Sequence, residues 1–120
     1  MSFTFRHLIT ATDGDTEIAG KGLRVYTVLG LYETGDSAEC IAEQYDVPVA
    51  AVHEALAYAA EHGDEMEAIR QEDEAADTRI VDQLPEQMRE DARRIMREHE
   101  ALRVDAIRRT REARRGAAVS

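Results

Sequence analysis

The sequence predicts a mainly α-helical protein with a short N-terminal β hairpin, a three-helix core containing a helix-turn-helix, and a long C-terminal helical extension. Short alternating segments with glycines between them precede residue 26 and are typical of strands. Apolar residues at helical spacing then fill 26–61, and a 4-3 apolar repeat follows Pro85. Three regions are therefore predicted: a β hairpin plus helix-turn-helix domain over 1–63, an acidic helical connector over 64–84, and a basic amphipathic helix over 85–120.

The N-terminal region has the pattern of a small β element. Residues 3–9 alternate bulky and polar side chains, which predicts a first short strand. Two further short strands are predicted at 16–19 and 23–25. They flank Gly20-Lys21-Gly22, where the two glycines permit positive φ and hence a tight turn.

Three helices are predicted to follow this hairpin. The first covers 26–33, with Gly35 as its C-cap and Ser37 as the N-cap of the second. The segment 37–61 has the spacing of two short helices across a turn at Asp46-Val47-Pro48, where Asp stands in place of the common Gly but tolerates the left-handed conformation. The inner faces are predicted to hold Ile41, Ala42 and Tyr45 in one helix and Val52, Ala55, Leu56 and Ala59 in the other.

The composition indicates an acidic, cytoplasmic protein. There are 25 acidic against 15 basic residues, and Lys21 is the single lysine. Such a surface is typical of proteins that stay soluble in multimolar salt, so a halophilic origin is predicted, with an ordinary acidic protein as the alternative. No apolar run reaches the roughly 20 residues of a membrane span, and no signal-peptide pattern is present. The one cysteine, Cys40, excludes an internal disulfide and is expected to be a buried small hydrophobe.

Charge is divided unevenly along the chain. Residues 1–85 hold 18 acids and 5 bases, a net charge of −13, whereas 86–120 hold 7 acids and 10 arginines, a net charge of +3. The stretch 64–82 has eight acidic residues and a thin apolar stripe, which predicts a solvated helix. Pro85 is placed to start a new helix, since it cannot donate the hydrogen bond of a helix interior.

The last predicted helix carries an apolar seam. Its spacing alternates between 4 and 3 for about three heptads, as in a coiled coil, so the helix is expected to need a partner helix. The polar His99 within it is placed to set the register of pairing. The predicted oligomer seam, which favours a homodimer, consists of Met88, Ala92, Ile95, His99, Leu102 and Ala106.

Two surfaces are candidate binding sites. The second helix of the helix-turn-helix would present Val49, Ala50, His53, Glu54 and Ala57 to a DNA major groove. These residues differ from the Arg, Lys, Asn and Gln that usually contact base edges, so dimerisation through the same fold is an equal interpretation, and Glu54 is expected to be a solvated charge. The second surface is an arginine cluster, predicted to bind a partner, at Arg103, Arg108, Arg109, Arg111, Arg114 and Arg115.

The arginine cluster has three interpretations. Its guanidinium groups could pair bidentately with the clustered carboxylates of a magnesium-dependent nuclease. They could instead pair with acids of their own helix or of the segment 64–82, in the same chain or a dimer mate. They could also contact nucleic acid phosphates, with the salt dependence that such contacts bring.

Enzymatic and metal-binding functions are not expected. The sequence has no nucleophile motif and no phosphate-binding glycine loop. The four histidines lie far apart without an i,i+4 partner, so neither a catalytic residue nor a metal or other cofactor is predicted.

The residues 18–28, IAGKGLRVYTV, followed by Gly35-Asp36-Ser37 and the ALAYAA of 55–60, resemble the family known as domain of unknown function 433. The resemblance covers about half of the chain and is strongest to antitoxin-type, VapB-like members, whose pattern is a short hairpin, a helix, a G-x-S step and a helix-turn-helix. Members are often encoded beside PIN-like ribonuclease toxins, which the resemblance implies as a possible partner.

Together these features favour an antitoxin-like protein of a type II toxin-antitoxin pair. In this interpretation the helix-turn-helix dimerises and binds DNA for autoregulation, while the C-terminal helix neutralises a PIN-like toxin. The alternative is a stand-alone transcriptional regulator whose arginine-rich helix contacts nucleic acid phosphates. A third interpretation is a structural coiled-coil adaptor.

Overall fold

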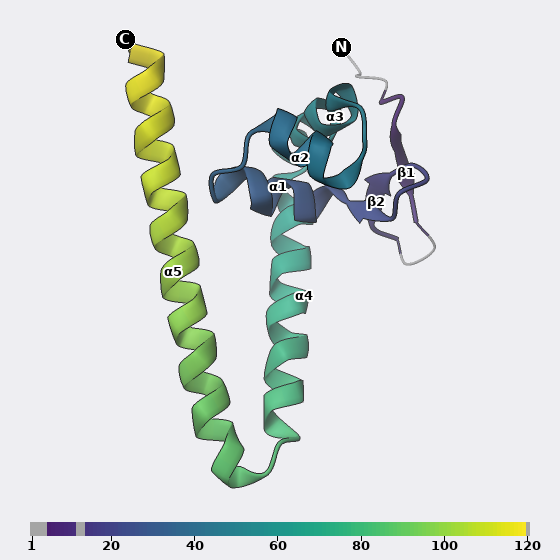
Figure 1. Ribbon diagram of the computed structural model, residues 1–120. Helices are drawn as coiled ribbons and strands as arrows, with labels where there is room; N and C mark the ends of the chain where they lie inside the picture. Colours follow the sequence, from purple (N-terminus) through teal and green to yellow (C-terminus); the bar gives the residue numbers. More distant parts are fainter. Residues whose placement is uncertain (1–4, 12–13, 120) are drawn as a thin grey trace. The chain divides into compact units, whose positions relative to one another are not determined.

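The computed structural model describes residues 5–11 and 14–119 and divides into two compact units, Met1–Met66 (unit 1) and Glu67–Ser120 (unit 2). The predicted fold class is confirmed: the described chain is mainly helical, with a small N-terminal sheet and a long C-terminal helix (Figure 1). Its elements are β1 (Leu8–Thr10), β2 (Thr16–Ile18), β3 (Leu23–Arg24), α1 (Val25–Glu33), α2 (Ala38–Tyr45), α3 (Val49–Glu61), α4 (Gly63–Asp82) and α5 (Glu86–Val119).

The three strands form an antiparallel sheet in the order β1-β2-β3. Ile18 lies opposite Leu8 on one side and Leu23 on the other, and both Ile18 and Leu23 are buried. The turn between β2 and β3 uses Gly20 and Gly22 at φ of 79° and 64°, as the sequence predicted. The first predicted strand is shorter than expected and later in the chain, since 5–7 precede β1 and 3–4 lie outside the described residues.

The connection from α1 to α2 follows the predicted caps. The amide of Asp36 donates to the carbonyl of Leu31 at 3.0 Å, and Gly35, at φ 124°, donates to that of Tyr32 at 3.3 Å. This pair of bonds is the Schellman motif, which places a left-handed residue after the last helical turn. The Ser37 hydroxyl then accepts from the amide of Cys40 at 3.1 Å and caps α2.

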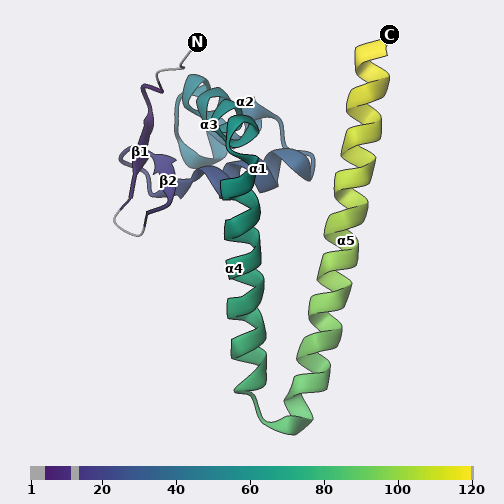
Figure 2. The same ribbon diagram turned by 180° about the vertical axis from the view of Figure 1, so that it is seen from behind.

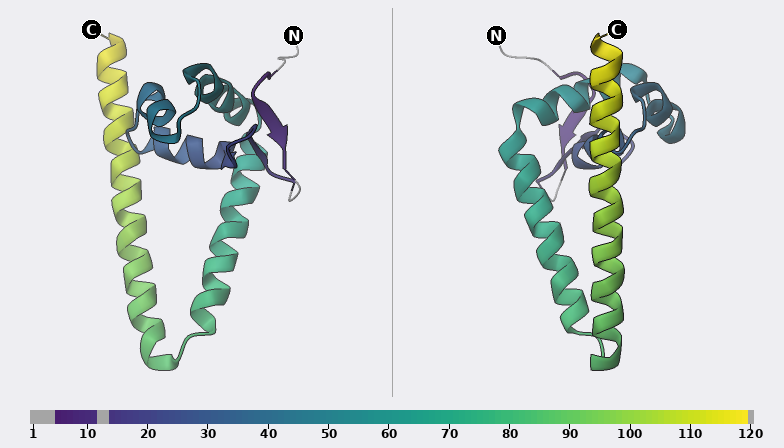
Figure 3. Two further views of the ribbon diagram at one scale, coloured as in Figure 1. Left: turned by 45° about the vertical axis from the view of Figure 1, so that its right-hand side comes forward. Right: turned by 90° about the vertical axis from the view of Figure 1, so that its left-hand side faces the viewer.

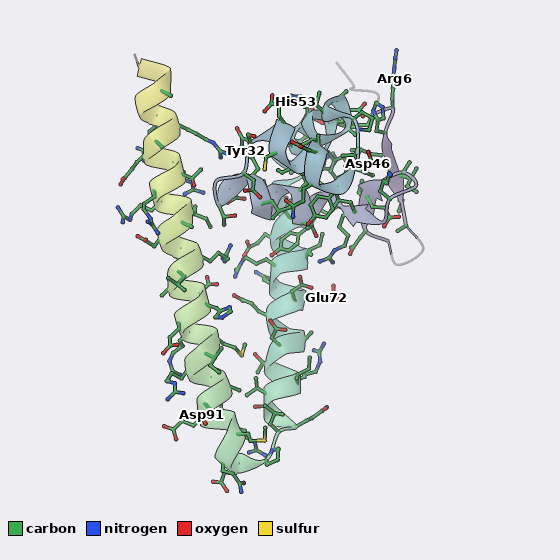
Figure 4. The ribbon with its side chains drawn as sticks, viewed as in Figure 1. Arg6, Tyr32, Asp46, His53, Glu72 and Asp91 are labelled. Atoms are coloured by element: carbon green, nitrogen blue, oxygen red, sulfur yellow. The ribbon has the colours of Figure 1, made fainter. Side chains whose placement is uncertain are left out.

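The turn of the helix-turn-helix repeats this motif with an aspartate. Asp46 adopts φ 53° and ψ 55°, and its amide donates to the carbonyl of Glu43 while that of Val47 donates to Ala42. Asp46 is the single non-glycine residue with positive φ in the described chain (labelled in Figure 4). Its carboxylate also lies 3.6 Å from the ammonium of Lys21 at the hairpin turn. Both groups are well exposed, so this ion pair contributes little.

The core of unit 1 is formed where α1, α2 and α3 meet beside the sheet (Figure 2). Its largest fully buried side chains are Val25, Val28, Ile41 and Val52, and the small Ala55 lets the helix backbones approach closely. The predicted inner positions are thus largely correct, although Tyr45 and Leu56 are only half-buried.

The prediction that Cys40 is buried was wrong. Its side chain is exposed on α2. The neighbouring Ile41 and Ala42 point into the core. Successive residues are rotated by about 100° around a helix, so Cys40 lies about 100° from Ile41 and about 200° from Ala42, on the outside of α2.

Unit 2 contains most of α4 and all of α5. The amides of Met88 and Arg89 donate to the carbonyl of Pro85, which directly precedes α5 as predicted. Helix α5 then continues without interruption to Val119 (Figure 3), a length of about 50 Å at 1.5 Å per residue.

Replacement of Asp46 tests the left-handed turn. Asp46→Val should destabilise unit 1 by about 1–2 kcal/mol, because a β-branched residue is disfavoured at positive φ. All four tyrosines lie in unit 1, so urea unfolding followed by tyrosine fluorescence measures this change. Asp46→Asn is the matched control: it removes the charge near Lys21 but tolerates the turn, and should remain within about 0.5 kcal/mol of the unchanged protein. Equal effects of Val and Asn would contradict this account.

Candidate interaction site

Helix α3 is held to the N-terminal segment by the carboxylate of Glu54. One oxygen accepts from the amide of Arg6 at 2.6 Å, and the other accepts from the amide of His7 at 3.0 Å and contacts Nδ1 of the same histidine. Burial raises the pKa of Glu54, but these hydrogen bonds outweigh it, so the pKa lies below its ordinary value of 4.5. The prediction that Glu54 is a solvated charge was therefore wrong.

Tyr58, one turn after Glu54, continues this contact. Its hydroxyl accepts from Thr16 of β2 at 3.1 Å and donates to the Glu65 carboxylate at 2.6 Å. Burial and the bond to Glu65 raise the pKa of Tyr58 above its ordinary value. Its ring stacks on His62 with centroids 4.0 Å apart and meets the edge of Phe5 at 5.6 Å. One side of α3 thus contacts the sheet and the first turn of α4.

The remaining predicted DNA-reading residues lie on the outside of α3. Val49, Ala50 and His53 are exposed (His53 is labelled in Figure 4), and Ala57 is half-buried. Without Glu54, this face offers one imidazole and otherwise short apolar side chains. Base reading usually relies on Arg, Lys, Asn or Gln, and orientation on DNA relies on several phosphate contacts. The exposed face of α3 carries neither kind of residue.

The sequence over residues 12–59 matches a family model described as protein of unknown function (DUF433). Residues 12–59 are therefore similar to DUF433 proteins. The DUF433 segment begins before β2 and ends within α3, so it includes neither α4 nor α5. No match was found among curated proteins. The search of solved structures also found none.

The predicted partner-binding arginines lie beyond the DUF433 segment, in the second half of α5. Several pair within their own helix: Arg103 donates to Glu100 at 3.0 Å, Arg108 to Glu112 at 3.2 Å, and Arg109 lies 2.8 Å from Asp105. Hydrogen bonds from Arg108 hold the pKa of the Asp105 carboxyl below its ordinary value. Because these side chains are largely exposed, each such pair is worth only about 0–1 kcal/mol and exchanges easily for another acid.

The predicted seam also lies on α5, and its large side chains are in solvent. Met88 is 53% exposed, Ile95 48% and Leu102 66%. His99 is exposed as well, while Ala92 and Ala106 are half-buried. The seam and the arginine cluster overlap in sequence only between Arg103 and Ala106, so α5 carries two surfaces in succession.

Other kinds of site find no support within the described residues. Across 5–11 and 14–119, no group of three or more His, Cys, Asp or Glu side chains is placed to hold a metal ion. In the same part of the chain, no helix combines the length and apolarity needed to cross a membrane.

The depressed pKa of Glu54 predicts a pH-dependent contribution to stability. Because the native pKa is below 4.5, the contribution is complete above that pH and is lost as the pH falls through the native value. Glu54→Gln should lower the free energy of unfolding by about 1–2 kcal/mol near neutral pH, and the difference from the unchanged protein should shrink below pH 4.5. Tyrosine-detected urea unfolding at several pH values measures it.

The matched control is Glu43→Gln, because Glu43 is exposed on α2 and its loss changes the net charge equally. This variant should follow the unchanged protein at every pH. A Glu54→Gln curve that runs parallel to the Glu43→Gln curve would contradict the role of the carboxylate.

Proposed function

We propose that this protein is an antitoxin-like partner-binding protein, in which unit 1 is an assembly module and the C-terminal part of α5 binds and neutralises a PIN-like ribonuclease toxin. The observation that carries the proposal is the exposed arginine cluster at the end of a 34-residue helix that lies outside the DUF433 segment. The likeness of that segment to antitoxin-type proteins supports the choice of partner.

The chemistry of the cluster suits an acidic protein site. Nucleases of this kind bind magnesium through grouped carboxylates, and a guanidinium can occupy such a group with two parallel hydrogen bonds. The arginines of α5 presently pair with exposed acids of their own helix, so a buried carboxylate cluster can compete for them. Binding would replace the charge of the metal and so suppress catalysis.

Direct reading of an operator by α3 forms no part of this proposal. The exposed face of α3 lacks the cations and amides that base reading and phosphate contacts use. High intracellular salt, which the composition predicts, would weaken binding through phosphate contacts further, because such binding depends on counterion release. Transcriptional control would therefore need α5 or a bound partner.

Replacement of the arginines at the end of α5 distinguishes toxin binding from a nucleic acid-binding function. In the triple variant Arg108→Gln, Arg111→Gln, Arg115→Gln, affinity for the co-expressed product of the neighbouring reading frame should fall about 10,000-fold or more, since each of the three lost charge-assisted pairs costs about 2 kcal/mol or more. Rescue of growth should fall with it. Co-purification and calorimetry measure the binding.

The matched control changes Arg93, Arg94 and Arg97 to Gln, which removes the same charge from the first half of α5 and should leave neutralisation intact. Equal loss in both variants would indicate a nonspecific effect of charge and contradict the proposal. A chain truncated after Leu84 that still neutralises would contradict it as well. If binding to a duplex DNA probe at native salt falls uniformly across sequences in the tail variant while toxin binding does not, the nucleic acid alternative holds instead.

A further inference from the structure

The seam of α5 has the full pattern of a heptad repeat. With Ile95 at a d position, the d residues are large and the a residues small or polar. The d positions are Met88, Ile95 and Leu102, and the a positions are Ala92, His99 and Ala106. We propose that this stripe pairs with the same stripe of a second copy of the chain as a parallel, two-stranded coiled coil.

The exposure of the stripe requires an occupant. Three large apolar side chains are each about half exposed or more along one face of a helix that is otherwise highly charged. From Met88 to Ala106 the stripe extends about 27 Å. Apolar residues scattered singly over a surface would not keep a regular 4-3 spacing over this length. A helix with the same stripe supplies a matching surface in register.

The charges beside the stripe favour a second copy as that occupant. The g positions are all acidic, and the e positions include two arginines. Arg94 and Arg108 pair with the four g acids inside the helix. These two arginines balance only two of the four acids, so the flank formed by the g residues keeps a net negative charge. The g residues are Asp91, Glu98, Asp105 and Glu112, and the e residues are Arg89, Met96, Arg103 and Thr110.

These flanks also determine the orientation. In a parallel pair, each g residue faces the e residue five positions later on the partner, which brings Glu98 to Arg103 twice, once on each side. In an antiparallel pair, g faces g and e faces e, so the acidic flanks would meet each other and the arginines would meet arginines. Like charges at such positions disfavour pairing, and the parallel arrangement avoids them.

The sizes of the seam residues favour two strands. Alanines at a allow two helices to approach closely, with the d residues filling the space between them. A third helix would enlarge the a layers, which alanine cannot fill, and leave cavities. The seam ends where Arg109 takes the next d position. Five of the six cluster arginines, from Arg108 onward, therefore lie beyond the paired segment, and this inference stands whether or not a toxin binds there.

Disulfide trapping tests both pairing and orientation in the full chain. In a Cys40→Ser background, which removes the exposed native thiol, Ala106→Cys should crosslink to its own counterpart under mild oxidation. In a parallel pair equivalent a positions face each other, whereas in an antiparallel pair position 106 faces the region of 88. Val104→Cys is the control, since Val104 is 53% exposed but lies two and a half turns from Ile95 and so on the opposite face.

The expected result is at least tenfold faster crosslinking of Ala106→Cys than of Val104→Cys. Crosslinking that requires a mixture of Met88→Cys and Ala106→Cys chains would show antiparallel pairing and overturn the proposed orientation. Equal rates for Ala106→Cys and Val104→Cys would overturn the seam itself.

Charge insertion provides a second, independent measurement. In the Ala106→Cys chain, Ile95→Asp should slow crosslinking at position 106 at least tenfold, whereas Val104→Asp should leave it unchanged. Unit 1 reports folding through its tyrosines, and circular dichroism reports α5, so loss of structure is separated from loss of pairing. Crosslinking at position 106 that survives Ile95→Asp, with α5 still helical, would overturn the proposal.

Discussion

The two-sided use of α3 is the constraint on which unit 1 depends. One face of the helix, with Val52 and Ala55 fully buried, packs on α1 and α2, while Tyr58 bonds to β2 and Glu54 bonds to the segment before β1. The strands are only two or three residues long, so the sheet depends on packing against the helices. Only the outer residues of α3 remain in solvent. The same bonds that complete the fold therefore remove Glu54 from any part in binding.

The two halves of the chain manage charge differently. In unit 1 the Glu54 carboxylate accepts hydrogen bonds from the backbone amides of Arg6 and His7, which is a structural use of charge. On α5 acids and arginines pair three or four residues apart in solvent, which adds little stability but keeps a long helix soluble. Exposed pairs of this kind exchange partners at small cost. This difference in the use of charge explains why partner binding is proposed on α5 rather than on unit 1.

Local signals in the sequence were sufficient for most of the fold. Gly35, Ser37 and Asp46 each have a conformational preference that acts within a few residues, and each occupies the predicted cap or turn. The role of Glu54 could not be predicted in this way, because its partners lie 47 and 48 positions earlier and no local pattern indicates them. Cys40 differs: it directly precedes the inward-facing Ile41 and Ala42, so helical geometry turns it outward although its side chain is hydrophobic. The residues of the proposed seam and arginine cluster could be placed on α5 because helical periodicity alone positions them.

The bond from Tyr58 to Glu65 has a consequence for how this chain can be divided. It joins the last turn of α3 to the first turn of α4, so the compact unit reaches to Met66, past the end of the family segment at residue 59. A recombination event that joined a different extension directly after residue 59 would leave the tyrosine hydroxyl without its acceptor. The first turn of α4 therefore belongs to unit 1, although the family segment ends before it.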